Sequence, residues 1–299
     1  SAFSIGTYHI TYSFTNASGC EESVTESFDI GIPVTLNINP SYCESESAFT
    51  LTANKPASIP DGHFKVYKGT SLIYEADEGT PQAVFDPSSQ KSGSYSVKYE
   101  VDDGGMGCSN SDSVGFVVHG LPDASFTLNG TPHSTIDIAF CNNQDTVTLK
   151  GANGGGTYYG TGVIGNKFVP KDVTPGNYKI NYEITGSQGC TNTDSTTVKV
   201  KALPVISIDT LKPAYCNNVD SFTILGNPSH GVWSDPWGVD SIFRDNGDGT
   251  ALFTPTYVPN EDDFTISYKV TGANSCADSV TQVVSINFIP YVDFAGLPG

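Results

Sequence analysis

Apolar and polar residues alternate in several short stretches along the chain. In the stretch 178–184, Tyr178, Ile180 and Tyr182 alternate with polar residues, which is the period of a β-strand with one buried face. A turn at 186–189 separates it from a second alternating stretch at 196–200, so the two predict a β-hairpin. Because a single sheet cannot bury its own apolar side, such hairpins predict β-sandwiches.

This hairpin pattern recurs four times. Each copy has an aromatic residue, an aliphatic residue and a tyrosine on alternate positions, with a cysteine 8 or 9 residues after the tyrosine. An aliphatic–proline pair follows each cysteine, and successive prolines of these pairs are 89, 82 and 86 residues apart. The pairs are Ile32-Pro33, Leu121-Pro122, Leu203-Pro204 and Ile289-Pro290. A period sustained over four copies indicates tandem domains.

The repeat predicts an all-β chain of tandem immunoglobulin-like β-sandwich repeats. The expected segments are the C-terminal part of a truncated repeat (1–32), a first repeat (33–121), a second repeat (122–203), a third repeat (204–289) and the start of a further repeat (290–299). Each whole repeat also has a Phe-x-Pro before the tyrosine strand, at Phe85, Phe168 and Phe253.

The seven cysteines follow the same period. Each whole repeat has an early cysteine, soon after its first proline, and a late cysteine, after the tyrosine strand. The repeat therefore favours one disulfide within each repeat, pairing Cys43 with Cys108, Cys141 with Cys190, and Cys216 with Cys276. Cys20 has the late position of the truncated repeat, so we expect its partner upstream of residue 1. Disulfides place the chain in an oxidising, extracellular environment.

Composition narrows the classes of function. The chain has 14 basic and 32 acidic residues, for a net charge of −18, which argues against nucleic acid as a partner. No apolar stretch approaches the roughly 18 residues of a membrane span, so we expect no direct membrane insertion. No nucleophile, base and orienting group stand at catalytic spacing, and we expect no enzymatic activity and no cofactor.

Three loops offer candidates for binding. The glycine-rich stretch 154–163 lacks the helix and Lys-Ser/Thr of a phosphate loop, so we interpret it as a hairpin with close backbone packing. The acidic stretches 245–250 and 261–263 leave weak Ca²⁺ binding open. Trp233 aligns with Tyr158 and is expected in the core, whereas Trp237 lies in a turn and is the candidate ligand-binding aromatic.

One short motif is over-represented: aspartate, then serine or threonine, then an apolar residue or threonine. Part of this excess is structural, because a turn aspartate followed by the start of a strand produces the same string. Six hydroxyl residues are found in it, namely Ser113, Thr146, Ser195, Thr210, Ser241 and Ser279.

The frame of the second repeat resembles a known class of repeats. Its Cys141, Gly155-Gly-Thr-Tyr, Phe168-x-Pro, Tyr178-x-Ile-x-Tyr and Gly189-Cys elements look like the tandem immunoglobulin-like and PKD-like repeats of large Bacteroidetes cell-surface proteins, which include gliding-motility adhesins exported by the type IX secretion system. The first and third repeats lack the Gly-Gly-Thr element. The resemblance implies an adhesin-like or filament-like stalk, and it implies O-glycosylation at the six hydroxyl residues of the short motif.

Three functions remain open at this point. The leading one is a structural spacer or stalk segment of a large repetitive cell-surface adhesin, whose immediate partners are neighbouring repeats. The alternative is a carbohydrate-binding accessory module of a secreted polysaccharide-active protein, in which Trp237 contacts surface glycans. The third is a linker stiffened by calcium.

Overall fold

The computed structural model describes residues 6–30, 34–55, 57, 60–77, 80, 82–102, 109–259 and 262–290. Two compact units divide the chain: Ser1–Ala124 with Glu183–Thr193, and Ser125–Tyr182 with Asp194–Gly299. The division does not follow the sequence repeat, because the tip of the second repeat's tyrosine hairpin, within 183–193, groups with the first repeat. The Cys43–Cys190 disulfide joins this tip to the first repeat.

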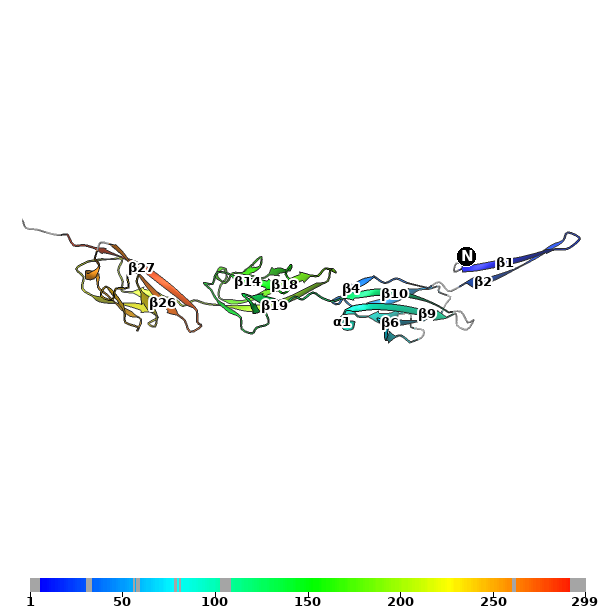
Figure 1. Cartoon of the computed structure of the whole chain (residues 1–299), viewed down its shortest axis with the longest axis horizontal. Helices are drawn as coiled ribbons and strands as arrows, with labels where there is room; N and C mark the ends of the chain where they lie inside the picture. The colour runs from blue at the N-terminus through cyan, green and yellow to red at the C-terminus, as the bar shows by residue number, and fades with distance from the viewer. Residues whose placement is uncertain are drawn as a thin grey trace, which may run out of the picture. The chain divides into compact units, whose positions relative to one another are not determined.

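Two sheets form the first repeat (Figure 1). The larger sheet has the order β4 (Ser41–Cys43), β10 (Ser109–His119), β9 (Gly93–Asp102), β6 (His63–Lys68) and β7 (Ser71–Glu75). The smaller sheet has the order β3 (Thr35–Leu36), β5 (Phe49–Asn54) and β8 (Gln82–Phe85). The short strand β4 runs parallel to β10, whereas β9 is antiparallel to both β10 and β6.

The second and third repeats have the same plan. In the second repeat one sheet contains β12 (Thr131–Pro132), β11 (Phe126–Leu128), β14 (Val147–Gly151), β17 (Lys167–Phe168) and β16 (Val163–Ile164), and the other contains β13 (Ala139–Cys141), β19 (Thr191–Lys201), β18 (Gly176–Thr185) and β15 (Thr157–Tyr159). In the third repeat one sheet has the order β20 (Ser207–Asp209), β22 (Phe222–Asn227), β25 (Thr250–Phe253) and β24 (Phe243–Asp245). The other sheet has the order β21 (Ala214–Cys216), β27 (Ala277–Asn287), β26 (Asp262–Thr271) and β23 (Val232–Ser234). The all-β prediction is confirmed, and these strand orders match an immunoglobulin-like sandwich.

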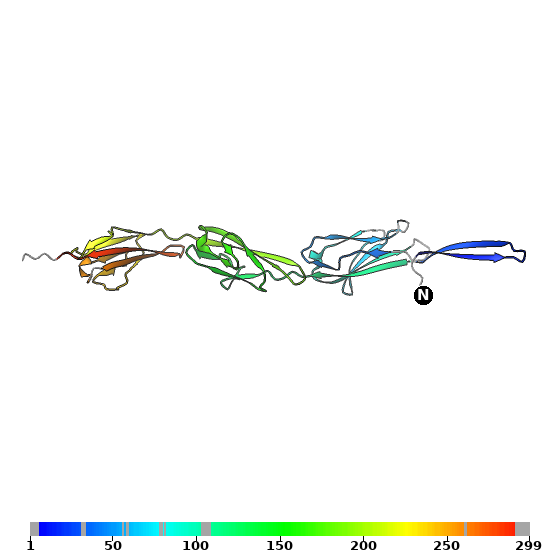
Figure 2. The ribbon, with the colours of Figure 1, turned by 90° about the horizontal axis from the view of Figure 1, so that it is seen from above.

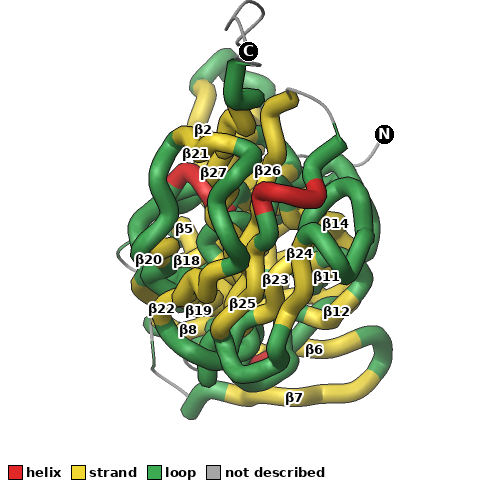
Figure 3. The backbone as a smooth tube through the Cα atoms, turned by 90° about the vertical axis from the view of Figure 1, so that its left-hand side faces the viewer, coloured by secondary structure: helices red, strands yellow, loops and turns green. Residues whose placement is uncertain are grey.

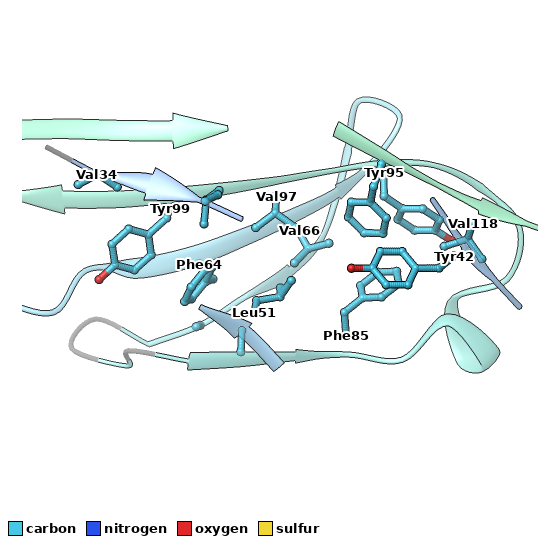
Figure 4. Packing of buried hydrophobic residues seen from close by; sticks show 14 of the residues in the cluster. Val34, Tyr42, Leu51, Phe64, Val66, Phe85, Tyr95, Val97, Tyr99 and Val118 are labelled. Atoms are coloured by element: carbon cyan, nitrogen blue, oxygen red, sulfur yellow. The ribbon is translucent and has the colours of Figure 1, made fainter. Parts of the chain in front are cut away.

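The alternating residues of the tyrosine strands form the core, as the sequence predicts. In the first repeat Tyr95, Val97 and Tyr99 are buried: Tyr95 packs against Phe85 of the opposite sheet, and Tyr99 packs against Phe64 of the neighbouring strand β6 (Figure 4). The third repeat has a separate core cluster, which includes the corresponding Phe264, Ile266 and Tyr268. Period-2 patterning therefore determines which face of each strand is buried.

The last tyrosine of the motif also has a polar role in the first and third repeats. The Tyr99 hydroxyl accepts a hydrogen bond from the backbone N–H of Gly62 at 2.7 Å. The Tyr268 hydroxyl accepts one from Gly231 N–H at 2.8 Å and donates to the carbonyl of Pro228. Each bond satisfies a buried hydroxyl and ties the hairpin to the loop opposite it.

Each Phe-x-Pro element ends one strand and starts a helical turn. Pro87 opens α1 (Pro87–Gln90), Pro170 opens η1 (Pro170–Asp172) and Pro255 opens η2 (Pro255–Tyr257). Proline suits this position because its fixed φ is compatible with a first helical turn and its missing N–H has no partner to lose there. These turns are the only helical elements in the part of the chain that the structure describes, which is otherwise strand and loop (Figure 3).

The N-terminal hairpin differs from the other tyrosine hairpins. Strands β1 (Gly6–Thr15) and β2 (Glu21–Ile30) pair from Gly6 with Ile30 to Thr15 with Glu21, and they form a two-stranded sheet (Figure 2). Its apolar residues, such as Ile10 and Tyr12, are exposed.

The glycine-rich stretch 154–163 is not a hairpin. Its strand β15 joins the sheet of β18, whereas β16 joins the sheet of β17, so the segment crosses from one sheet to the other. The predicted close packing is present: a Cβ at Gly160 would overlap the carbonyl oxygen of Lys179, and the Tyr182 hydroxyl donates to the carbonyl of Gly154 at 3.3 Å.

Candidate functional site: disulfide junctions between repeats

The disulfides join different repeats. Cys43 is bonded to Cys190 and Cys141 to Cys276, across sequence separations of 147 and 135 residues. Each bond connects the early cysteine of one repeat to the late cysteine of the next. Cys216 is exposed and unbonded.

The predicted pairing within each repeat is therefore wrong. Cys43 with Cys108, Cys141 with Cys190, and Cys216 with Cys276 are not the pairs that form, and Cys108 itself lies outside the described residues. The repeat correctly separated early from late cysteines but did not show which repeat supplies the partner.

Strand geometry explains why the pairs cannot form within a repeat. In the third repeat Cys216 pairs in register with Asn287, the last residue of β27, whereas Cys276 immediately precedes Ala277, the first residue of that strand. The eleven residues of β27 span about 33 Å at roughly 3.3 Å per residue. The early and late cysteines of one repeat therefore lie at opposite ends of the sandwich. Because a disulfide needs Cα atoms within about 7 Å, these two cysteines cannot bond to each other.

The first junction is contained in the first compact unit. Cys43 ends β4, where the N–H of Glu44 donates to the carbonyl of His119 at 2.9 Å. Across the bond, Cys190 is buried, and the Asn192 side chain donates to the carbonyl of Pro122 at 2.8 Å. The recurrent proline after each repeat is thus part of the contact surface for the next hairpin.

The second junction, in the other unit, repeats this arrangement. Cys276 is buried beside Cys141, and the Asn143 side chain donates to the carbonyl of Ala277 at 2.9 Å. Lys201 Nζ likewise donates to the carbonyl of Asn274 at 2.8 Å, and in the opposite direction Asn274 Nδ2 donates to the carbonyl of Ala202 at 2.8 Å.

Each junction therefore has three kinds of connection: the continuous backbone, one disulfide, and side-chain to backbone hydrogen bonds. The two disulfide-closed loops, 43–190 and 141–276, also overlap along the chain. If the chain were unfolded and pulled from its two ends, the force would pass through the two disulfides and bypass the residues between them. Only the segments 1–43, 141–190 and 276–299, about two fifths of the residues, would then be stretched. The arrangement limits the extension of the chain.

The aspartates of the short motif have structural roles where the motif follows a late cysteine. The side chains of Asp112, Asp194 and Asp278 each accept from the N–H of the next residue, at 2.8, 2.7 and 2.9 Å. Asp112 also accepts from the N–H of Leu36 at 2.7 Å, and Asp194 lies 2.7 Å from His133 Nε2.

The hydroxyl residues of that motif are mostly accessible. Ser195 is half-buried in β19, and the exposed ones are Ser113, Thr146, Thr210, Ser241 and Ser279. Their use as glycosylation sites stays a prediction.

The two tryptophans differ in burial. Trp233 is 4% exposed and packs at a tilt against Tyr268 with a ring-centroid distance of 4.4 Å, in the place where Tyr158 stacks on Tyr182 at 4.5 Å, so its expected core position is confirmed. Trp237 is half-buried, with its ring edge-on to Phe264 at 5.1 Å. Part of the Trp237 side chain is therefore used in packing.

The carboxylates of the 245–250 loop stabilise its turns. Asp245 accepts from the N–H groups of Trp233 at 3.0 Å and Gly247 at 2.9 Å, and Asp248 accepts from both the N–H and the hydroxyl of Thr250. The bonds from the Thr250 hydroxyl and then from its N–H lower the pKa of Asp248. Glu261, in the other acidic stretch, lies outside the described residues. Within the residues that the structure describes, no group of three or more His, Cys, Asp or Glu side chains could hold a metal ion.

Sequence reasoning missed an ionic cluster in the first repeat. Glu100 of β9 contacts Lys98 at 2.6 Å, Lys65 at 2.7 Å and His63 at 3.3 Å. Hydrogen bonds from Lys65 and then Lys98 lower the pKa of Glu100 to about 2. The cluster borders a polar cleft of about 690 Å³ beside Gly62. Alternation along β6 and β9 places these residues on one outer face, but only the register of the pair brings them into contact.

Comparisons with known proteins give weak similarities of fold. No protein-family model matches the chain, and no curated protein sequence matches it. A Ca²⁺-stabilised adhesin that helps an Antarctic bacterium bind ice aligns with a TM-score of 0.30 and 11% identity, over 94% of this chain and 82% of that one. Fibronectin(III)-like modules of Clostridium thermocellum CbhA align with 0.27 and 15%, over 57% and 95%. The human Desmocollin-1 ectodomain aligns with 0.26 and 13%, over 92% and 66%. At these scores the similarities carry no argument about function.

No helix among the described residues is long and apolar enough to cross a membrane.

Proposed function

We propose that this chain is a spacer segment of an extracellular stalk, in which disulfides clamp each immunoglobulin-like repeat to the next. The observation that carries the proposal is the repeated junction, where Cys43–Cys190 and Cys141–Cys276 join early to late cysteines in the same way. A spacer must resist extension, and this need is met by a second covalent link at each of the two junctions. The segment has no catalytic role in this proposal.

Three further observations support an exterior, structural role. Disulfides persist in oxidising compartments, and the net charge of −18 suits a soluble surface that is exposed to solvent. Repeats that contact only their neighbours allow a stalk to lengthen by copying. The origin in a Bacteroidetes gliding adhesin exported by type IX secretion, with O-glycosylation of the six motif hydroxyls, is supported by the resemblance of the repeats alone.

The carbohydrate-binding alternative has less support. It depends on Trp237, whose ring packs against Phe264. A glycan array is the direct test of this alternative: binding of the chain that is lost in Trp237→Ala would favour an accessory module over a spacer.

Single-molecule pulling from the two ends tests the spacer. We expect the oxidised chain to unfold to about two fifths of the extension that it reaches after reduction, because both disulfides remove chain from the load path. The double variant Cys141→Ser with Cys276→Ser should reach an intermediate extension. A matched control, Cys20→Ser with Cys216→Ser, changes only cysteines that are unbonded here and should leave the limit unchanged. Equal extensions before and after reduction would contradict the proposal.

A further inference from the structure

Cys216 occupies the place that a bonded early cysteine has in the other two repeats. Cys43, Cys141 and Cys216 each end a short strand that runs parallel to the last strand of the repeat. The residue after each cysteine donates its N–H to the carbonyl of the paired residue, at 2.9, 3.0 and 2.9 Å. The third repeat therefore has the same backbone geometry at this end as the two repeats that hold a disulfide there.

The surroundings of Cys216 also match those of a junction. Asn218 stands two residues after Cys216, as Asn143 stands two residues after Cys141, and Asn143 donates to the hairpin of the next repeat. Asn218 and Cys216 are both exposed, whereas Cys141 is half-buried by its partner. Pro290 follows the third repeat as Pro122 and Pro204 follow the others.

Cys20 occupies the place of a bonded late cysteine. In the turns before Cys20, Cys190 and Cys276, the N–H four residues earlier donates to the cysteine carbonyl at 2.9, 2.8 and 2.8 Å. In each turn the residue directly before the cysteine has a positive φ, with values of 80°, 82° and 67°. The N-terminal hairpin thus presents its exposed Cys20 in the conformation that the two bonded hairpins have.

We propose that Cys216 and Cys20 are the two complementary halves of a further junction of this type. The end of the third repeat that carries Cys216 receives the late-cysteine hairpin of another repeat, meaning a tyrosine hairpin with a cysteine at its tip. The β1–β2 hairpin of a second copy is the example that this chain itself provides. The inference rests on the proposed spacer function, because it uses the same junction as the unit of assembly.

The chemistry is thiol–disulfide exchange. A low-molecular-weight disulfide such as oxidised glutathione is attacked by one cysteine thiolate, which gives a mixed disulfide and releases one glutathione thiolate. The second cysteine then attacks the protein sulfur of the mixed disulfide and releases the other glutathione. Two protein thiols are oxidised to one disulfide, and the glutathione disulfide accepts the two electrons and two protons.

The pairing has a direction. Early and late cysteines have different surroundings, so a junction links Cys216 of one copy to Cys20 of another and leads to linear chains. Exposed thiols that are oxidised without such surroundings would also give symmetric dimers, linked Cys216 to Cys216 or Cys20 to Cys20. The identity of the linked cysteines therefore distinguishes a junction from incidental oxidation.

The test is oxidation of the full chain in a glutathione redox buffer at moderate salt, which screens the repulsion between two acidic copies. Cys108 is replaced by serine in every sample, because it is another late cysteine. Non-reducing electrophoresis and mass spectrometry of linked peptides then identify the bonds. We expect dimers and longer chains in which Cys216 is linked to Cys20.

Three variants provide the controls. Cys20→Ser alone and Cys216→Ser alone should remain monomeric, and their mixture should stop at a dimer. Moving the thiol within the turn, in Ser18→Cys with Cys20→Ser, keeps an exposed cysteine but should slow linkage at least about tenfold. This shifted-thiol variant tests geometry even if the hairpin is weakly folded.

Three results would overturn the inference: no linkage, mainly Cys216–Cys216 or Cys20–Cys20 bonds, or equally fast linkage by the shifted thiol. None of them would affect the spacer, which is tested separately by the extension limit of a chain that lacks Cys20 and Cys216.

Discussion

The hairpins β26–β27 and β1–β2 have the same sequence pattern and opposite surroundings. In the third repeat Phe264, Ile266 and Tyr268 are all 0% exposed, whereas in the N-terminal hairpin the corresponding Ile10 and Tyr12 are 60% and 68% exposed. Both hairpins pair ten residues of one strand with ten of the other, without a break in register. Local pattern and turn chemistry are therefore enough to define strand pairing in both.

The difference lies in the opposite sheet. Strands β22 and β25 supply Ile224 and Phe253, which pack with Phe264 in the core of the third repeat. An isolated two-stranded hairpin is marginally stable in water, so packing supplies most of the free energy that holds β26–β27. The comparison separates two roles of one motif: it specifies a hairpin by itself, and it forms a core only when a second sheet covers it.

The largest expected effect comes from removing the last tyrosine of the motif. Tyr268→Ala should lower the free energy of unfolding of the third repeat by about 3–5 kcal/mol, because it leaves a cavity and removes the hydroxyl that ties down the 228–231 loop. Tyr12→Ala, at the matched exposed position, should change stability by less than about 0.5 kcal/mol. Hydrogen exchange of the β26–β27 amides in Tyr268→Ala, and of the β1–β2 amides in Tyr12→Ala, measures each hairpin against the parent protein. Similar losses in the two variants would contradict the difference in packing.

A smaller loss of stability is expected when a methyl group is added at Gly226, the position in the opposite sheet that leaves space for Tyr268. A Cβ at Gly226 in β22 would overlap the Tyr268 ring, so Gly226→Ala should cost about 1–3 kcal/mol through overpacking. Gly176→Ala is the matched control, because its nearest neighbour to a new Cβ is Tyr178 at 3.7 Å, an ordinary contact. Thermal unfolding of both variants measures the contrast, and a neutral Gly226→Ala would show that the ring can shift.

The smallest effect concerns the outer face of the equivalent hairpin in the first repeat. The pKa of Glu100 is lowered from 4.5 to about 2 by Lys65 and Lys98, so the ionised group stabilises the folded state above about pH 4.5. That contribution is lost as the pH falls from about 4.5 to about 2. After allowance for solvent screening of a side chain that is 28% exposed, Glu100→Gln should cost about 1–2 kcal/mol at pH 7.

Hydrogen exchange of β9 and β10 amides, with variant and parent compared at the same pH, measures the Glu100 contribution. The difference between the two proteins should disappear near pH 2. Ser13 stands at the matched position of β1, and Ser13→Ala should show no dependence on pH. A difference that persists unchanged at pH 2 would show that packing of the longer side chain, and not its charge, is responsible.

Much of the fold and part of the site follow from the sequence because they depend on neighbouring residues. Alternation at Tyr178, Ile180 and Tyr182 is the period of a strand, and it identified the buried face correctly. The recurrent prolines and cysteines located the hairpins and the repeat ends. Trp233 was placed in the core because it stands where Tyr158 stands in the second repeat.

The tertiary structure decided which distant groups meet. Early and late cysteines have the same period in the sequence whether they pair within a repeat or between repeats, and only the length of β27 separates Cys216 from Cys276. The contacts of Glu100 with Lys65, and of Trp237 with Phe264, likewise depend on strand register and on how a loop folds back. The sequence by itself determined strands, hairpins and repeats, since these are local. The disulfide partners, the ionic cluster and the exposed or buried state of a tyrosine hairpin were decided by packing over long separations.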